Sequence, residues 1–229
     1  MATTSLISTS RPHSALPQPR SAGKRARIIE VAMRHFAEHG YDSARVADIA
    51  AELGIAKGSV FQHFGSKDGL FLEAYKKAVR AFSPYLNVPA EVRRQGFFEV
   101  LQYWLVRTEH MVREDWVPYR VYLLGNYGTD LALKREINRF LIAEDPYGRI
   151  EFVRWGLQRG ELRTDVDVEM IVSIIDWMVE RFQDALLVEE LDPGLFRRSG
   201  EDGQRKDARI GQFLELLKRA IGNPQLRSN

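Results

Sequence analysis

From Lys24 onward, apolar residues recur at the three- and four-residue spacing of one helix face, and no lasting apolar–polar alternation predicts a strand. The first helix is predicted over about 24–39, ending at Gly40, with an apolar stripe of Ile28, Ile29, Ala32, Met33 and Phe36. Further helices are predicted over about 45–53 and 57–64, from the N-cap Ser66 to about Phe82, and over 90–113, 116–125, 130–160 (broken or kinked at Pro146), 167–190 and 207–221. The chain is therefore predicted to be all-α.

Residues 1–23 show neither the helical spacing of apolar residues nor the alternation typical of a strand. They are rich in Ser, Thr, Pro and Ala and contain no acidic residue, which predicts a disordered tail. Two alternatives are an organelle-targeting peptide and a phosphate-binding arm that uses Arg11, Arg20, Lys24 and Arg25. The predicted organisation is a tail (1–23), a small helical domain (24–66) and a larger helical domain (67–225).

The segment VADIAAELGIAKGSVFQHF, residues 46–64, has the pattern of a helix-turn-helix. Ala50 is small enough for two short helices to cross closely, and Gly54 can adopt the left-handed conformation of a sharp turn. The core beneath would be filled by Ile49, Leu53, Ile55 and Val60. The outer side and leading end of the second helix would be free to enter a major groove, and carry Lys57, Gly58, Ser59, Phe61, Gln62 and His63. The alternative is a buried helical hairpin that contains a glycine by chance.

Residues 24–82 resemble the N-terminal domain of the TetR family of regulators, through the stretch ARIIEVAMRHFAEHGYDSARVADIAAELGIAKGSVFQHFGSKDGLF. The resemblance implies a three-helix DNA-binding domain followed by a larger helical domain for ligand binding and dimerisation. It also implies a homodimer whose two recognition helices read an approximately palindromic operator in double-stranded DNA. A small-molecule effector bound in the C-terminal domain would control the distance between those helices, most often to release a repressor.

The resemblance implies that base edges are contacted by Lys57, Ser59 and Gln62, and phosphates by Arg45, His63 and Lys67. The chemistry of the side chains agrees with these roles. Gln62 can pair with adenine and Lys57 with the acceptors of guanine. Lys67 brings a positive charge to a helix N-terminus, which itself favours a phosphate.

Three positions depart from the family pattern. Phe61 replaces a usual Tyr and cannot donate a phenolic hydrogen bond to a phosphate. Arg45 replaces a Thr, which exchanges a short hydroxyl contact for a longer ionic one. Ala56 stands where a capping Ser is frequent, so the recognition helix is expected to fray more easily.

The charge of the chain supports a nucleic-acid contact at one end. Residues 1–67 contain nine Lys or Arg and five Asp or Glu, whereas the whole chain has a net charge of only +2. There are no cysteines, which excludes disulfides and thiolate chemistry, and no apolar run is long enough to span a membrane. A cytoplasmic protein with no membrane partner is expected.

The stretch 68–160 is rich in aromatic residues, which favours a cavity for an apolar or aromatic ligand. Candidate lining residues are Tyr103, Arg107, His110, Tyr119, Tyr122 and Trp155, and an anionic group of the ligand would lie near Arg107 or Arg120. The alternatives are that the aromatic residues form only core, and that Arg107 and His110 pair with Glu109 or Glu114.

Two wide apolar stripes, over 167–190 and 207–221, predict a four-helix dimer interface. Its candidate residues are Ile171, Ile175, Met178, Phe182, Ile210, Phe213 and Leu217. The alternative is packing within one protomer.

No phosphate loop, dinucleotide-binding glycine pattern, zinc-protease motif or nucleophile elbow is present, so no enzymatic activity, cofactor or metal site is predicted. His35 and His39 have a metal-ligand spacing but lack a convincing third ligand, which favours solvated helix residues. A rival hypothesis is a helix-turn-helix that binds DNA non-specifically, or only binds proteins, without an effector.

Overall fold

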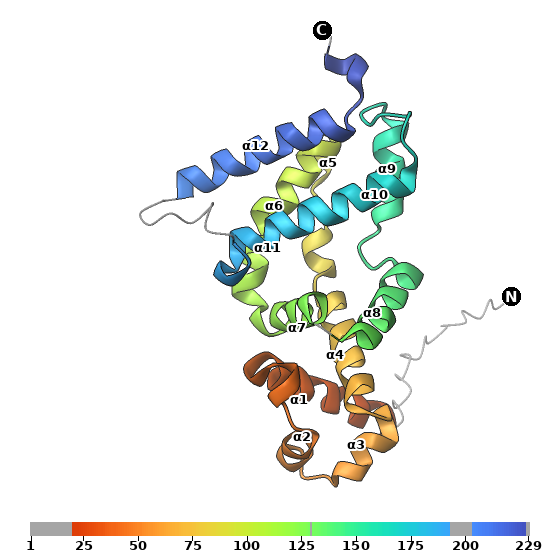
Figure 1. Cartoon of the computed structure of the whole chain (residues 1–229), viewed down its shortest axis with the longest axis vertical. Coiled ribbons are helices and arrows are strands. Elements are labelled where there is room, and N and C mark those ends of the chain that lie inside the picture. Colours follow the sequence, from red (N-terminus) through yellow and green to blue (C-terminus); the bar gives the residue numbers. More distant parts are fainter. Residues whose placement is uncertain (1–19, 129, 193–202, 228–229) are drawn as a thin grey trace, which may run out of the picture.

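The computed structural model describes residues 20–128, 130–192 and 203–227 of the chain. Most of these residues are helical, and the part described holds no strand beyond one isolated bridge, Leu162 to Gly222. A head of three helices lies at one end and α12 at the other (Figure 1). The head consists of α1 (Arg20–Ser43), α2 (Val46–Glu52) and α3 (Lys57–Phe64). The all-α prediction is confirmed. No described helix combines the length and the apolar character needed to cross a membrane.

The body begins with α4, which leads out of the head, and continues through eight further α-helices. These are α4 (Lys67–Ala81), α5 (Ala90–Gln95), α6 (Phe97–Glu114), α7 (Trp116–Tyr127), α8 (Leu131–Glu144), α9 (Arg149–Gln158), α10 (Val168–Ile175), α11 (Arg181–Leu187) and α12 (Gly203–Ile221). Shorter turns are η1 (Ser83–Leu86), the π-helical η2 (Asp176–Glu180), η3 (Glu189–Leu191) and η4 (Pro224–Arg227). The predicted tail, 1–23, lies almost entirely outside the described residues.

Two predicted helical stretches are each divided, one where no break was expected and one at the expected proline. The predicted helix 90–113 breaks at Gly96, whose φ is +151°, because α6 begins anew with the Phe97 N–H donating to the Glu161 carboxylate at 2.6 Å. The predicted helix 130–160 breaks at a loop around Pro146, as expected for a residue that cannot continue a helix. Asp145 ends α8 in a left-handed conformation.

The buried apolar residues form two cores, which we call the proximal and the distal core. The proximal core is built by α1–α4, α7 and α8, so the head shares its interior with the lower body; among its most buried members are Ile28, Phe36, Ile49, Val60, Phe71, Tyr75, Tyr119 and Ile137. The distal core is built by α6, α9, α10, α11 and α12 and includes Phe97, Leu101, Val153, Leu162, Ile171 and Leu217.

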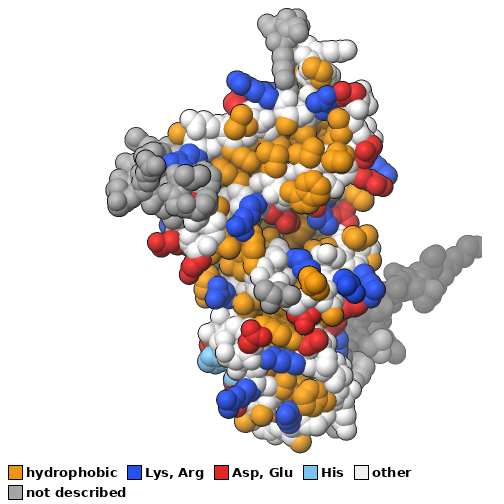
Figure 2. Space-filling view, in the orientation of Figure 1, with side chains coloured by type: hydrophobic (Ala, Val, Ile, Leu, Met, Phe, Trp, Pro, Cys, Tyr) orange, Lys and Arg blue, Asp and Glu red, His pale blue; other side chains and the backbone are white. Residues whose placement is uncertain are grey.

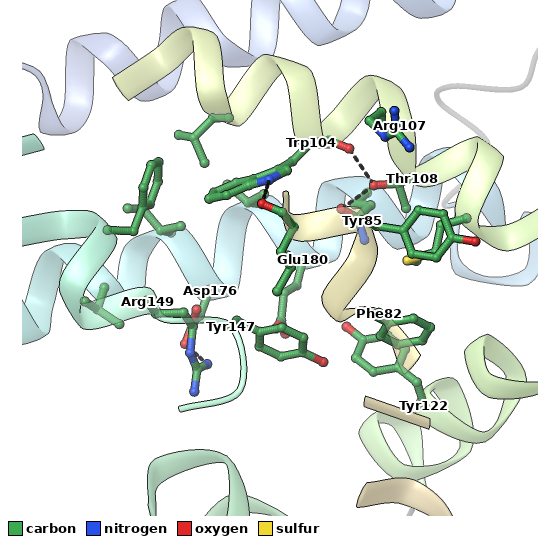
Figure 3. Close-up of a pocket in the computed structure, with 18 of the residues that line it drawn as sticks. Phe82, Tyr85, Trp104, Arg107, Thr108, Tyr122, Tyr147, Arg149, Asp176 and Glu180 are labelled. Carbon is green, nitrogen blue, oxygen red and sulfur yellow. Dashed lines mark hydrogen bonds and ion pairs between the residues drawn. The ribbon is translucent and has the colours of Figure 1, made fainter. Parts of the chain in front are cut away.

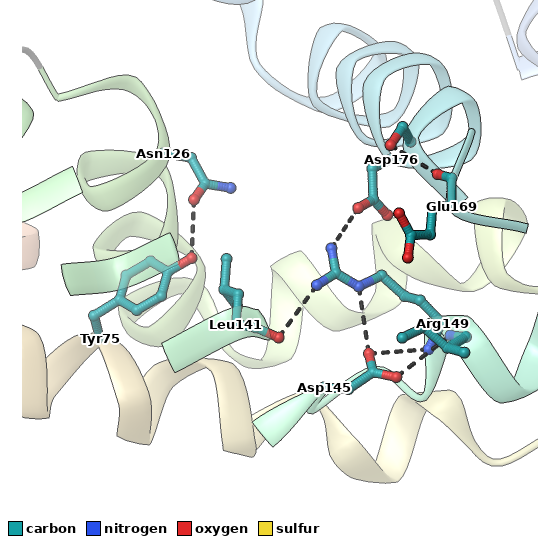
Figure 4. Close-up of polar contacts among 9 residues, drawn as sticks. Tyr75, Asn126, Leu141, Asp145, Arg149, Glu169 and Asp176 are labelled. Carbon is teal, nitrogen blue, oxygen red and sulfur yellow. Dashed lines mark hydrogen bonds and ion pairs between the residues drawn. The ribbon is translucent and has the colours of Figure 1, made fainter. Parts of the chain in front are cut away.

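Helix α7 is held tightly against α4. A Cβ on Gly125 would lie 2.5 Å from the ring of Tyr75, so only glycine permits this approach of the two helices. The Tyr75 hydroxyl donates to the Asn126 side-chain oxygen at 2.9 Å, which fixes the same contact (Figure 4). Helix α7 also packs against α1. Helix α7 therefore contacts both α1 of the head and α4, the helix that leads out of the head.

Candidate nucleic-acid interface and ligand cavity

The turn between α2 and α3 has the geometry of a helix-turn-helix. Gly54 has a φ of +64°, and the Ile55 N–H donates to the Ala50 carbonyl at 3.0 Å. Ala50 and Val60 are buried at the crossing of the two helices. The small residue and the glycine therefore do what the sequence pattern predicted: they let α3 cross α2 closely and present its other face to solvent.

The outward face of α3 is largely accessible. Lys57, Gly58 and Gln62 are exposed, and Ser59, Phe61 and His63 are half-buried. The Ser59 hydroxyl accepts a hydrogen bond from Lys24 Nζ at 2.9 Å, so the start of α1 contributes a cation to this face. The sequence suggested Lys24 only as part of an arm, because nothing in its spacing relates α1 to α3.

The three predicted phosphate-binding residues differ in their surroundings. Arg45 is exposed at the N-cap of α2, and His63 is half-buried at the end of α3. Lys67 is held against α1, since its ammonium donates to the Asp42 carbonyl at 3.0 Å and lies 4.7 Å from the centre of the Tyr41 ring. Lys67 therefore joins α4 to α1 in addition to any contact with DNA.

His35 and His39, which have a metal-ligand spacing in the sequence, each lie beside a glutamate. His35 Nε2 lies 2.8 Å from Glu52, which also pairs with Arg34 at 2.5 Å. The hydrogen bonds from His35 and Arg34 lower the pKa of the Glu52 carboxyl and fasten α1 to α2. No group of three or more potential metal ligands occurs within the described ranges.

Comparisons with known proteins agree with this geometry. A family model described as bacterial regulatory proteins of the tetR family matches residues 28–74. The HTH-type transcriptional repressor AcnR of Corynebacterium efficiens is 30% identical over 172 residues, which cover 75% of this chain and 86% of that protein. The crystal structure of FadR from Bacillus subtilis in complex with stearoyl-CoA has a TM-score of 0.61 at 20% identity, covering 84% of this chain and 96% of that one. A TetR family regulator from Marinobacter aquaeolei VT8 gives 0.56 at 15% identity, covering 89% and 98%.

The fold and the α2–α3 turn define a helix-turn-helix DNA-binding protein. The chain belongs to the TetR family of transcriptional regulators. The resemblance seen in residues 24–82 is thereby confirmed, and so is the prediction that the protein is a regulator and not an enzyme.

A cavity of about 160 Å³ lies between the two cores, and we call it the inter-core cavity (Figure 3). Its walls come from the proximal core (among them Phe82, Met111, Tyr119 and Tyr122) and from residues of and beside the distal core (among them Leu101, Trp104, Phe152, Val172 and Val179). An engineered apolar cavity of about 150 Å³ binds benzene, so this space suits a ring-sized group.

Most polar groups in the wall of the inter-core cavity have protein partners. Thr108 Oγ1 donates to Gln183 at 2.9 Å, and the Trp104 indole donates to the Leu86 carbonyl at 3.3 Å. Arg107 Nη1 donates to the Tyr103 hydroxyl at 3.1 Å, whereas its buried Nε has no partner. Arg107 therefore retains donor capacity for a ligand.

Arg149 holds the base of the cavity together. Its guanidinium contacts Asp176 at 2.5 Å and donates to the Leu141 carbonyl at 3.3 Å, and the Asp145 carboxylate caps the Arg149 N–H at 3.0 Å (Figure 4). These contacts join α8, α9 and η2. Arg149 and Asp176 neutralise one another and are better explained as a clamp than as ligand-binding groups.

Three of the six residues predicted to line the cavity do so: Arg107, Tyr119 and Tyr122. The other three need correction. Tyr103 does not line the cavity and accepts a hydrogen bond from Arg107, and exposed His110 pairs with Glu114 at 3.0 Å. Trp155 does not line the cavity: it packs on Phe152, with ring centres 5.8 Å apart, and its ring contacts Arg93 and Arg159.

Arg120, the second predicted anion-binding residue, lines a different cleft where α1, α7 and α8 meet. Tyr147 and Glu180 also line the inter-core cavity, although neither was predicted from the sequence. A usable signal was the four-residue spacing of Asp176, Glu180 and Asp184 along a helix that is rich in apolar residues.

The predicted dimer residues divide by burial. Ile171, Phe182, Ile210 and Leu217 are buried in the distal core, because α10, α11 and α12 pack on one another first; a second copy could not reach these side chains. Ile175 and Phe213 are half-buried, and Met178 is exposed. Apolar side chains nevertheless gather over α10 and α12 (Figure 2). The large apolar residues that are exposed on α10, η2 and α12 are Met170, Trp177, Met178 and Leu216. We call these four residues the apolar patch.

Proposed function

We propose that the protein is a homodimeric repressor that binds an approximately palindromic operator and is released by a small apolar or aromatic effector. The observation that carries this proposal is the position of the inter-core cavity. One of its walls belongs to the same core that fills the head, so a molecule in the cavity contacts residues that are continuous with the DNA-binding end.

In this proposal, α3 of each protomer enters a major groove. Lys57, Ser59 and Gln62 would contact base edges. Gly58 has no side chain and would allow close approach, and the Phe61 ring lies 5.5 Å from Lys57 Nζ. Arg45, His63 and Lys67 would contact phosphates, and these contacts would supply most of the salt-dependent affinity. Lys24 would join the second group, because its ammonium already lies at Ser59.

The apolar patch supports the dimer. Trp177 is 68% exposed and Leu216 61%, and large apolar side chains gathered on one face usually mark an interface. A two-fold axis through this face would pair α10–η2 and α12 with the same elements of a second copy. Two heads held in this way could read half-sites about 34–36 Å apart, which is one turn of DNA.

The size and lining of the inter-core cavity support a compact effector. The FadR structure holds stearoyl-CoA, which is far larger than a cavity of about 160 Å³, so we do not extend that ligand to this chain. A molecule with one ring and a short polar substituent fits better. An anionic substituent would bind at Arg107, where Nε lacks a partner. Repressor activity is proposed by analogy with AcnR.

The experiment that tests the proposed function is selection of bound DNA from a random pool by the full chain. The expected result is one enriched, approximately palindromic sequence. Salt-sensitive binding with no enriched sequence would support the rival hypothesis of non-specific DNA binding. Absence of DNA binding at low salt would support a protein-interaction module instead.

A further inference from the structure

One end of the inter-core cavity carries polar groups that no protein partner satisfies. The Tyr147 hydroxyl is buried and has no hydrogen-bond partner in the part of the chain described. The carboxylate of Glu180 forms no hydrogen bond or ion pair with any described residue. Figure 3 shows both residues among those that line the cavity. A buried polar group is rarely left unpaired unless a ligand or water completes it, and this applies to the Tyr147 hydroxyl. Glu180 is half-buried and lines the same cavity.

Glu180 differs from its two acidic neighbours on the same continuous helix. Asp176 is neutralised by Arg149 at 2.5 Å, and buried Asp184 accepts hydrogen bonds from Tyr119 and Tyr127. Glu180 lies between them and has no such partner. It ends η2, a π-helical turn, and π-helical turns frequently occur at functional sites.

The charges around Glu180 nearly balance without a ligand. The negative groups are Asp176 on η2 and Asp184 on α11, and the positive groups are Lys134 on α8 and Arg149 on α9. Three phenols also face this end: Tyr75 on α4, Tyr122 on α7 and Tyr147 in the loop before α9. Burial raises the pKa of the Glu180 carboxyl to about 7. Asp145 beside Arg149 and Arg181 beside Asp184 add one charge of each sign. An ionised Glu180 would therefore leave this end one charge negative, which favours a cation.

We propose that this end of the cavity is a subsite for a protonated amine, with the Glu180 carboxylate as its counterion and the Tyr147 hydroxyl as a hydrogen-bond acceptor. The rings of Tyr122 and Tyr147 add a favourable environment for a cation. The inference rests on the proposed function and narrows its effector to a compact aromatic or apolar amine.

The test uses three ring-sized probes that differ in the charge of the polar end: phenethylamine, 2-phenylethanol and 3-phenylpropionate. At pH 8, calorimetric titration is expected to give phenethylamine the highest affinity of the three. Glu180→Gln should weaken phenethylamine binding by about 10- to 100-fold and change 2-phenylethanol binding by less than about threefold. Glu169→Gln, which alters an exposed carboxylate on α10, is the matched control and should change neither affinity.

The pH dependence of the wild-type protein gives a second measurement that needs no variant. Phenethylamine stays protonated between pH 6 and pH 8 while Glu180 ionises, so its affinity should rise with pH and that of 2-phenylethanol should not. The folded protein also holds the Glu180 proton to a higher pH than the unfolded chain does. Its melting temperature should therefore fall as pH rises through this range, and less so in Glu180→Gln.

Equal affinities for the amine and the alcohol, or an amine preference that persists in folded Glu180→Gln protein, would overturn the subsite. Tightest binding of 3-phenylpropionate would also overturn it, while leaving an effector with an anionic group at Arg107 in place. Failure of all three probes to bind would overturn it as well. The DNA selection described above uses no ligand, so failure of the proposed repressor function is detected separately.

Discussion

Tyr119 donates its phenolic hydrogen to the buried carboxylate of Asp184 over 2.8 Å, which ties α7 to α11 beside the inter-core cavity. Tyr127, at the other end of α7, donates to the second oxygen of the same carboxylate at 2.7 Å. Helix α7 also packs against α1 and α4, which support the head. Helix α7 thus contacts the cavity, the distal half of the body and the DNA-binding end. We therefore expect a bound ligand to affect the head through α7.

Tyr119→Phe removes this hydrogen bond and keeps the ring. Because one oxygen of a fully buried carboxylate loses its donor, we expect the free energy of unfolding to fall by about 1–3 kcal/mol, measured by urea denaturation. Tyr85→Phe is the control, since its hydroxyl contacts the partly solvated Glu114 and Asp115. A loss no larger than that of the control would contradict the role given to the Tyr119–Asp184 bond.

Gln62→Ala should separate base recognition from general DNA affinity. On the selected operator we expect a loss of about 1–3 kcal/mol, with little change on random DNA, because only a base contact distinguishes the two sequences. Arg45→Ala should weaken both and reduce the slope of log affinity against log salt by about one. Fluorescence anisotropy across a salt series measures both quantities. Equal losses on the two DNAs would remove Gln62 from the base-reading residues.

Arg45 is a better test of phosphate contact than Lys67. Replacing Lys67 would also remove its hydrogen bond to the Asp42 carbonyl and its contact with the Tyr41 ring, so affinity and stability would change together. Arg135→Ala, at an exposed position on α8, is the matched control for loss of a positive charge away from the head.

Trp177→Glu and Leu216→Glu should each convert the proposed dimer to a monomer. Both side chains are exposed in the protomer, so a charge there disrupts a partner contact without entering the distal core. Sedimentation velocity at micromolar concentration measures the change. Ile142→Glu, at a residue that is 78% exposed on α8 and outside the apolar patch, should leave the dimer intact. A wild-type protein that sediments as a monomer would rule out this interface.

The head could be predicted closely from the sequence because its determinants are local. Ala50 and Gly54 define the turn within five residues, and both α2 and α3 begin and end within about a residue of the predicted bounds. Ser66 caps α4 as expected, accepting from the Gly69 N–H at 3.0 Å. Each of these features depends on neighbours in the chain.

The body could be predicted only in outline, because its site depends on contacts distant in sequence. At the break at Gly96, the N–H of Phe97 donates to Glu161, which is more than sixty residues away in the chain. A contact over this distance cannot be predicted from the spacing of apolar residues. The side on which a helical aromatic residue lies also depends on the rotation of its helix, so Trp104 lines the cavity while Trp155 does not. In the same way, a wide apolar stripe on α10 or α12 could not be divided from sequence into a buried half and an exposed half.

The most direct test of the account is the affinity of the selected operator, measured with and without a ligand that binds the inter-core cavity. Such a ligand can be found as a compound whose stabilisation of the protein is lost when the cavity is filled by Val172→Trp. We expect a saturating ligand to weaken operator binding by about 5- to 150-fold, and operator DNA to weaken ligand binding by the same factor. A ligand that stabilises the protein through this cavity and leaves operator affinity unchanged would contradict it.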